Sequence, residues 1–492
     1  MRVAGITLLL LACLFYPTSP FGQTTKPPAL SSIKEADIKR DVYALADDHF
    51  RGREAGTPDE LKVAVWWADE LRKAGVAPAG DDGTYFQFFN LWRNRVSAAS
   101  TVKIGSSALV LWQDVLVAFT APANVSSTVV YAGKADKSTL DSLDLRGKVV
   151  AVEVSPDSIN LAVSLPERRY PSYVYRKYGI DLVARGAAGI IFIADAMGEK
   201  SWPAVLPALT RGSYDIDGGP NVNMSPRVPV LWVHGNNTAT LKGNPVAEIS
   251  IAMEHFSYPS VNVIGKVAGT DPVRKTEFVL YSGHNDHDGI RTPYGNDSIY
   301  NGADDNASVS GAMLAIARAF KKAPAKRSVL FVFHGAEERG LLGSRFFVAN
   351  PTVDKNSIVA VLNGDMIGYN SIDSAVLMGV QPPHLNSPDL VKMALDANRE
   401  GNAFRLDTMW DKADHIEGWY FRSDHLPYAR AGYPAIFYSS LLHPIYHTPM
   451  DEAKVLDYNK IKKMADWMYR TGWKLANAPK RPALLPGFKL ER

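Results

Sequence analysis

Five short segments of this chain carry histidine or carboxylate side chains beside apolar runs. Four of these segments follow a predicted strand, and the fifth precedes a predicted helix, so the polar side chains fall on loops. The carboxyl ends of strands in an open α/β sheet are where such folds build their sites. The segments are residues 282–289 (SGHNDHDG), 301–308 (NGADDNAS), 334–344 (HGAEERGLLGS), 361–368 (VLNGDMIG) and 446–451 (YHTPMD).

Each segment taken alone also has a simpler interpretation. His284, near a strand end, would most often be a hydrogen-bonded surface residue. Asp305 lies in a stretch of Asp, Asn and Ser before a helix, a composition that capping alone explains. The pair Glu337 and Glu338 is harder to explain in this way, because like charges directly after an apolar strand are costly unless a cation is present.

Taken together, the segments predict a metal site. His284 and His447 offer nitrogen donors, and carboxylates offer oxygen donors, a mixture that suits zinc better than manganese or cobalt. Two zinc ions would carry four positive charges against three negative charges, and a bound hydroxide would neutralise the remainder. The three carboxylates in this count are Asp305, Glu338 and Asp365.

Two further acids lie beside these candidate ligands. Asp286 is two residues from His284, where a carboxylate holds the second ring nitrogen of a metal-binding histidine. Glu337 is adjacent to a ligand without being needed as one, and it would serve as a general base. The other nearby histidines are expected to be loop or supporting residues: His287, His334, His425 and His443.

These motifs resemble those of peptidase family M28, the co-catalytic zinc exopeptidases that include bacterial leucine aminopeptidases and glutamate carboxypeptidases. The resemblance rests on five motifs in the same order, and the segments 52–56 (GREAG) and 422–425 (RSDH) are also similar to that family. One departure is Val309, which stands where the family usually has glycine. The five motifs are His284-x-Asp286, Asp305-Asn-x-Ser, Glu337-Glu338, Asn-x-Asp365-Met and Tyr446-His447-Thr.

The resemblance implies a role for each ligand. Asp305 would bridge two zinc ions, His284 and Asp365 would complete the coordination of one, and Glu338 and His447 that of the other. No candidate ligand is missing from the sequence.

The resemblance also implies three catalytic roles. Glu337 would activate the metal-bridging water, and Asp286 would orient His284. Tyr446 would polarise the scissile carbonyl and stabilise the oxyanion, as a phenol is able to do. A packed aromatic ring remains the alternative interpretation of Tyr446.

Composition argues against several classes of function. The 492 residues are 46% hydrophobic and 21% charged, with a formal net charge of +3. The charges are interspersed, so no basic stripe indicates a nucleic-acid partner. The only cysteine, Cys13, lies in the N-terminal apolar stretch, which excludes a disulfide framework and any thiolate metal site in the mature chain.

The N-terminus predicts export. Residues 1–23 have a basic start and an apolar run too short to span a membrane, which is typical of a signal peptide. We expect a secreted or periplasmic protein without a membrane span. The alternative is a lipoprotein anchored at Cys13, because residues 10–13 (LLAC) resemble a lipobox.

Periodicity predicts an α/β fold, a mixed sheet covered by helices on both faces, with an inserted β-rich domain. Strands are expected at 277–282, 328–333, 357–362 and 435–438, and helices at 308–322, 341–349 and 458–476. We assign the main domain to 30–106 and 257–478 and a tail to 479–492. The insert at 107–256, with its segments 145–150 (LRGKVV) and 186–192 (GAAGIIF), resembles the protease-associated domain found in many family members.

The sequence therefore favours a zinc-dependent exopeptidase acting on peptide substrates, with two zinc ions per chain. An aminopeptidase is preferred, because carboxylates are available to hold a free ammonium group. Arg422 and Arg291 keep a glutamate carboxypeptidase-like activity open as the alternative. More remote alternatives are a glutaminyl cyclase, which uses one zinc, and a binding protein that has lost catalysis.

Overall fold

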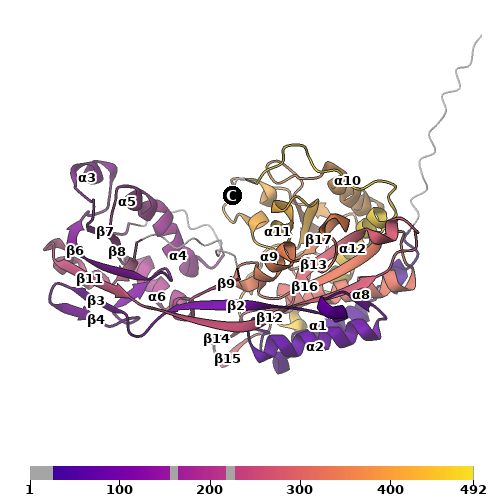
Figure 1. The fold of residues 1–492 in the computed structure, drawn as a ribbon, viewed down its shortest axis with the longest axis horizontal. Coiled ribbons are helices and arrows are strands. Elements are labelled where there is room, and N and C mark those ends of the chain that lie inside the picture. Colours follow the sequence, from indigo (N-terminus) through magenta and orange to yellow (C-terminus); the bar gives the residue numbers. More distant parts are fainter. Residues whose placement is uncertain (1–25, 156–163, 218–227, 491–492) are drawn as a thin grey trace, which may run out of the picture.

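The computed structural model describes residues 26–155, 164–217 and 228–490. The predicted signal peptide at 1–23 and Cys13 lie outside the described residues. Among the helices within these ranges, none has the length and apolar character needed to cross a membrane. The chain forms a larger and a smaller α/β domain, which lie side by side (Figure 1).

The larger domain is built on a ten-stranded mixed sheet. Its central strands β13, β16, β17 and β20 run parallel, and antiparallel strands flank them on both sides. The order across the sheet is β19 (Arg405–Leu406), β18 (Ser374–Met378), β20 (Ala435–Ser439), β17 (Ile358–Gly364), β13 (Phe278–His284), β16 (Ser328–His334), β12 (Met253–Val267), β2 (Phe86–Val96) and β9 (Ser213–Ile216), with β1 (Ala77–Pro78) paired to β12.

Helices cover both faces of this sheet because alternate strand residues point to opposite sides. Tyr281 packs in the cluster formed with the helices of one face, and the adjacent Leu280 packs in the cluster of the other. The strands are apolar on both sides, as expected for buried parallel strands. The first face carries α1 (Glu35–Leu45), α2 (Pro58–Lys73), α8 (Val309–Lys322), α10 (Pro388–Ala397) and α12 (Tyr458–Asn477), and the second carries α9 (Leu342–Ala349) and α11 (His425–Arg430).

The smaller domain has an eight-stranded sheet with hydrophobic clusters of its own. The order is β4 (Ser107–Leu109), β3 (Thr101–Ile104), β11 (Val246–Ile251), β6 (Ala123–Tyr131), β7 (Val149–Glu153), β8 (Gly189–Ile193), β10 (Val230–Val233) and β5 (Val115–Val117). Its helices are α3 (Lys137–Ser142), α4 (Pro166–Val174), α5 (Ile180–Ala184), α6 (Ala196–Arg211) and α7 (Thr238–Lys242).

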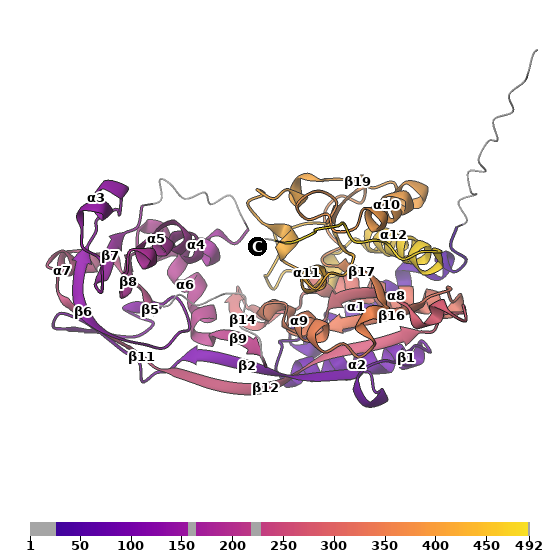
Figure 2. The same ribbon diagram turned by 45° about the horizontal axis from the view of Figure 1, so that its top comes forward.

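Two long strands join the domains. β2 and β12 pair antiparallel from Val96 and Met253 at one end to Phe86 and Val263 at the other, and they run from the smaller domain under the larger one (Figures 1 and 2). The second sheet takes in β3, which precedes residue 107, where we expect the insert to begin. The strand β9 comes from the insert sequence but pairs with β2 in the main sheet.

The predicted elements of the larger domain agree with the structure to within a few residues. The strand expected at 328–333 is β16, and the helix expected at 458–476 is α12. The tail at 479–490 has neither helix nor strand, but it packs on the larger domain, where Leu485 N–H donates to the Asn386 carbonyl over 2.7 Å. A hairpin of β14 (Gly289–Tyr294) and β15 (Asp297–Tyr300) follows β13 and faces the smaller domain.

Candidate metal centre

The parallel strands end at one edge of the main sheet, and the predicted ligands lie there. His284 is the last residue of β13, and Asp365 follows the last residue of β17. Glu337 and Glu338 form the turn after β16. Because β13 pairs directly with both β16 and β17, the three strand ends bring these side chains together.

One group of side chains gathers around His284. Its Nε2 atom lies 3.1 Å from Asp305 Oδ1, 3.7 Å from Asp365 Oδ2 and 3.9 Å from Glu337 Oε2. His284, Asp365 and Glu337 offer atoms close enough to hold one cation. The predicted ligands His284, Asp305 and Asp365 are therefore neighbours in space.

A second group gathers around His447, with Asp305 shared between the two. His447 Nε2 lies 3.2 Å from Asp305 Oδ2 and 3.3 Å from Glu338 Oε1. His287, expected to be a loop or supporting residue, is buried inside this group, with Nδ1 2.9 Å from Glu338 Oε1. These four side chains also offer atoms close enough to hold one cation.

The donor set fits bound metal ions. The Nε2 atoms of His284 and His447 and the Oε1 atom of Glu338 are buried, yet none makes a hydrogen bond with a described residue. Buried polar atoms without partners are costly unless something else coordinates them. Histidine nitrogens mixed with carboxylate oxygens are donors that zinc accepts.

The charged side chains of the two groups shift one another's pKa values strongly. Burial and the neighbouring acids raise the pKa of Glu337 well above its usual range, although His284 opposes the shift. Burial would lower the pKa of His284, but the acids around it, led by Glu337, raise it well above the usual value. For Asp305, burial is outweighed by His284 and His447, and its pKa is held well below the usual value. Such strong coupling is typical of functional sites.

Asp286 has a different contact from the one we expect. The Nδ1 atom of His284 lies 3.1 Å from the backbone oxygen of Asp286 but 3.8 Å from its carboxylate. The carboxylate instead accepts hydrogen bonds from the backbone N–H groups of Glu337 and Glu338, over 3.0 and 3.3 Å. Asp286 therefore fixes the turn that presents both glutamates, and its backbone oxygen faces His284.

Asp288 is a functional candidate that the sequence analysis missed. Its Oδ2 atom lies 2.9 Å from His447 Nδ1, the ring nitrogen that faces away from Asp305. Arg291 and Arg339 approach the Oδ1 atom of this carboxylate over 3.2 and 3.5 Å. A carboxylate on the outer nitrogen of a metal-binding histidine fixes the orientation of its ring. The unbroken run of polar residues from His284 to Asp288 was the only sequence signal.

The loop that carries Asp305 is held by buried polar contacts. The carboxylate of Asp451 accepts hydrogen bonds from the backbone N–H groups of Asp304 and Asp305, over 2.8 and 3.1 Å. Asn306 donates to the Gly364 carbonyl over 3.1 Å, which joins this loop to the end of β17. From the other side, the buried Arg53 donates to the carbonyls of residues 285, 301 and 302. The position of Asp305 between the two groups thus rests on buried hydrogen bonds to this loop.

Comparison with known sequences identifies the domain that carries these groups. The profile of peptidase family M28 matches residues 262–471. Residues 262–471, somewhat less than half of the chain, are thus similar to peptidase family M28. A probable leucine aminopeptidase of Trichophyton verrucosum (strain HKI 0517) is 26% identical over 257 residues, which are 50% of this chain and 66% of that protein. The chain thus spans just under two thirds of the length of this curated relative.

Solved structures share the fold of the chain. The aminopeptidase from Aneurinibacillus sp. strain AM-1 superposes with a TM-score of 0.59 at 18% identity, covering 94% of this chain and 98% of that one. BSAP, a zinc aminopeptidase from Bacillus subtilis, superposes with a TM-score of 0.56 at 18% identity, covering 93% and 99%. At this identity the likeness establishes the fold of the chain alone.

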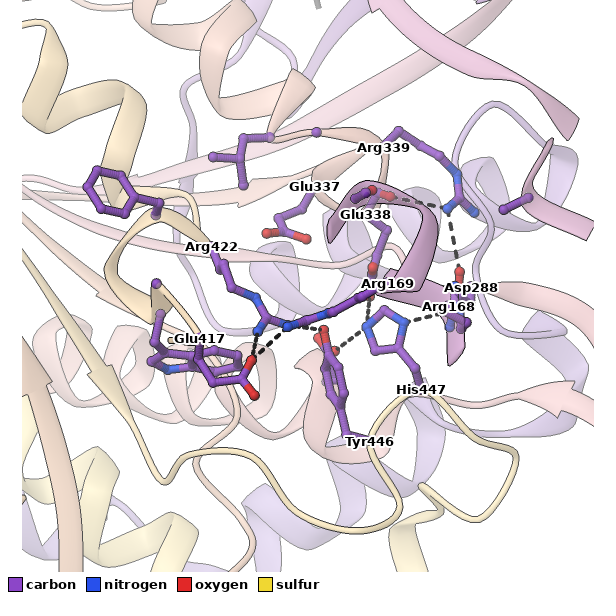
Figure 3. A pocket seen from close by; sticks show the side chains of 18 of the residues that line it. Arg168, Arg169, Asp288, Glu337, Glu338, Arg339, Glu417, Arg422, Tyr446 and His447 are labelled. Atoms are coloured by element: carbon purple, nitrogen blue, oxygen red, sulfur yellow. Dashed lines mark hydrogen bonds and ion pairs between the residues drawn. The ribbon is translucent and has the colours of Figure 1, made fainter. Parts of the chain in front are cut away.

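Tyr446 lies beside the metal groups, between Arg422 and His447 (Figure 3). Its hydroxyl oxygen accepts a hydrogen bond from Arg422 Nη2 over 3.0 Å. Glu417 holds the same guanidinium over 2.9 Å and also pairs with Arg169 of the smaller domain over 2.7 Å. Tyr446 therefore has a fixed ring position, and a chain of contacts links it to α4.

A cavity of about 830 Å³ opens over both metal groups. Residues of the larger domain form its floor, and residues of α4 and α6 from the smaller domain form part of its wall. The volume of the cavity is large enough for a short peptide segment. Its floor includes Asp305, Glu337, Glu338, Asp365, Tyr446 and His447.

Proposed function

We propose that this protein is a zinc-dependent aminopeptidase that hydrolyses the N-terminal bond of peptides. The observation that carries the proposal is the pair of candidate ligand groups at the floor of an open cavity, where Asp305 belongs to one group and lies 3.1 Å from His284 of the other. The names of the sequence relatives and of the structural neighbours support the same class of reaction.

Two zinc ions per chain are part of this proposal. His284 and Asp365 would hold one ion, Glu338 and His447 the other, and Asp305 both. His287 would either position the Glu338 carboxylate by contact or add a nitrogen donor to the group around His447. When bound, zinc acts as a Lewis acid and makes water a better nucleophile at neutral pH.

Glu337 moves the proton in this mechanism. Its carboxylate lines the cavity, and its raised pKa suits a group that gains and then releases a proton. Glu337 takes a proton from the water that attacks the peptide carbonyl and passes it to the departing amine as the C–N bond breaks. Asp286 keeps Glu337 in place through its backbone N–H.

Tyr446 stabilises the charge that develops on the carbonyl oxygen. Because the phenol oxygen already accepts a hydrogen bond from Arg422, its own O–H is available to donate into the cavity. A donor fixed before the reaction stabilises an oxyanion more than a mobile one does. The Arg422 charge beside the ring strengthens this donor.

Export and the role of the insert also remain proposals. We propose that residues 1–23 direct the protein out of the cytoplasm and that residues 107–256 form a protease-associated domain over the site. Sequencing the N-terminus of the secreted protein tests the first point. A mature chain that begins after residue 23 supports signal cleavage, and one that begins with a lipid-modified Cys13 supports the lipoprotein alternative.

The activity is tested with purified protein on amino-acid p-nitroanilides and N-blocked dipeptides, with and without chelator and added zinc. We expect release from the free-amino substrates, loss of release with chelator, and recovery with zinc. The variant Glu337→Gln should bind zinc and release product about 10²–10⁴-fold more slowly. Cleavage of blocked dipeptides alone would establish a carboxypeptidase, and cleavage of neither would reject the peptidase proposal.

A further inference from the structure

A second, smaller cavity of about 310 Å³ opens beside His447. Three arginines line it, Arg168 from α4, Arg211 from the end of α6, and Arg291 from β14. Among the described residues that line this space, no side chain is a carboxylate. The rest of the wall is mostly apolar and includes Pro203 and Pro207. We call this space the arginine cavity, defined by Arg168, Arg211 and Arg291.

The positive charges around the arginine cavity outnumber their counter-charges. Arg291 pairs with Glu54 and Asp288, each over 3.2 Å, and Arg339 approaches the same two carboxylates over 3.4 and 3.5 Å. Arg211 reaches Glu54 only at 3.7 Å. Three guanidinium groups thus share two carboxylates.

Arg168 and Arg211 are the least compensated members of this set. Arg168 is exposed to the cavity and makes no hydrogen bond or ion pair with any residue that the structure describes. Burial, together with Arg339 and Arg291, lowers the pKa of Arg211 to about 10. An anion in the arginine cavity would relieve this repulsion.

We propose that the arginine cavity binds a carboxylate group of the substrate while the adjacent peptide bond lies over the metal groups. This inference rests on the proposed peptidase function and names its substrate class, which is short peptides that carry a carboxylate near the scissile bond. Guanidinium groups bind carboxylates through paired hydrogen bonds, and the apolar wall accommodates the carbon atoms beside the carboxylate.

The carboxylate has two sources, the C-terminus of a dipeptide and the side chain of an acidic residue. Leu-Gly, Leu-Gly-amide and Leu-Asp-amide separate them, and leucine p-nitroanilide is the reference substrate without a carboxylate. The variants are Arg168→Gln and Arg211→Gln. The matched control is Arg176→Gln, because Arg176 is an exposed arginine just after α4 that lines the larger cavity and not the smaller one.

We expect wild-type protein to cleave Leu-Gly with a kcat/KM about tenfold or more above that for Leu-Gly-amide. Arg168 and Arg211 also line the larger cavity. Arg168→Gln and Arg211→Gln should remove this advantage and change the rate on leucine p-nitroanilide much less than the rate on Leu-Gly, whereas Arg176→Gln should retain the advantage. If Leu-Asp-amide behaves like Leu-Gly, acidic side chains are also accepted; if it behaves like Leu-Gly-amide, only the C-terminus is. Equal rates on the three peptides, with no selective loss in either variant, overturn the proposal.

A binding measurement keeps the test independent of catalysis. Calorimetry with N-acetylglycine and N-acetylglycinamide on the zinc-loaded protein should show binding of the carboxylate alone, weakened about tenfold by Arg211→Gln and by Arg168→Gln. If the carboxylate bound only at the metal ions, the affinity for N-acetylglycine would be the same in Arg168→Gln as in the wild type. That result would overturn the proposal that the arginine cavity binds the carboxylate. Failure of the peptidase proposal would appear separately, as no release from leucine p-nitroanilide. If the protein cleaved only N-acetyl-Leu-Gly, and Arg211→Gln lost this cleavage, the enzyme would be a carboxypeptidase. Carboxylate binding in the arginine cavity would still be supported.

Discussion

Replacing Asp288 by asparagine tests whether His447 is a metal ligand whose ring the protein holds in place. The side chain of Asp288 is 3% exposed, and its Oδ2 atom lies 2.9 Å from His447 Nδ1. The substitution Asp288→Asn keeps the size of the side chain and removes its charge. The amide oxygen still accepts a hydrogen bond from the ring, so the orientation is weakened rather than abolished.

The size of the effect follows from this contact. Loss of a carboxylate that orients a metal-binding histidine costs about 10–100-fold in metal affinity, which equals about 1.4–2.7 kcal/mol. Only the ion at His447 and Glu338 should be affected, because His284 Nδ1 faces the backbone oxygen of Asp286 and has no contact with Asp288. We therefore expect one weakened zinc and one unchanged zinc per chain.

The assay is competition for zinc between the metal-free protein and a fluorescent chelator, run beside kcat/KM on leucine p-nitroanilide at increasing free zinc. Activity should fall at limiting zinc and recover most of its wild-type value at excess zinc. Asp297→Asn in the β15 strand is the control, because Asp297 contacts neither metal group. Two unchanged zinc affinities, or an activity loss that zinc does not restore, would refute the proposed role of Asp288.

Three further substitutions give distinct outcomes. Glu337→Gln should lower kcat about 10²–10⁴-fold with zinc content unchanged, because it removes the general base and no proposed ligand; loss of zinc would contradict this. Tyr446→Phe should lower kcat about 10²–10³-fold and leave KM nearly constant if the phenol donates to the oxyanion; a rise in KM alone would assign it to substrate binding. Burial raises the pKa of Glu60 to about 8, so the folded chain keeps a proton that the unfolded chain releases. The free energy of unfolding should then fall as the pH rises from about 4.5 to about 8, by on the order of 3–4 kcal/mol, and Glu60→Gln should remove this fall, as denaturation at both pH values will show.

The strands of the larger domain were predictable because they are apolar on both faces and end in abrupt polar segments. The run from Val329 to Phe333 becomes β16, and the polar turn that follows presents Glu337 and Glu338. The parallel order of neighbouring strands then brings their ends together, so the proposed ligands meet although they are far apart in the sequence. Their role as ligands remains a proposal.

The rest of the site depends on loop conformation, which local sequence patterns do not encode. His287 lies beside Glu338, and Asp288 beside His447, because of the path that the chain takes between β13 and β14. The contact between Glu417 and Arg169 joins segments separated by 248 residues. Likewise β9 enters the main sheet because β2 extends beneath both domains and leaves an edge to pair with.

The most direct test of the whole account is the zinc content of the purified protein at saturating zinc, measured by mass spectrometry together with release of leucine from leucine p-nitroanilide. We predict two zinc ions per chain in the wild type, and one ion with no release in each of His284→Ala and His447→Ala. A wild-type protein that binds one zinc or none, or histidine variants that keep both ions, would contradict the proposal that these two groups share Asp305 as a single catalytic centre.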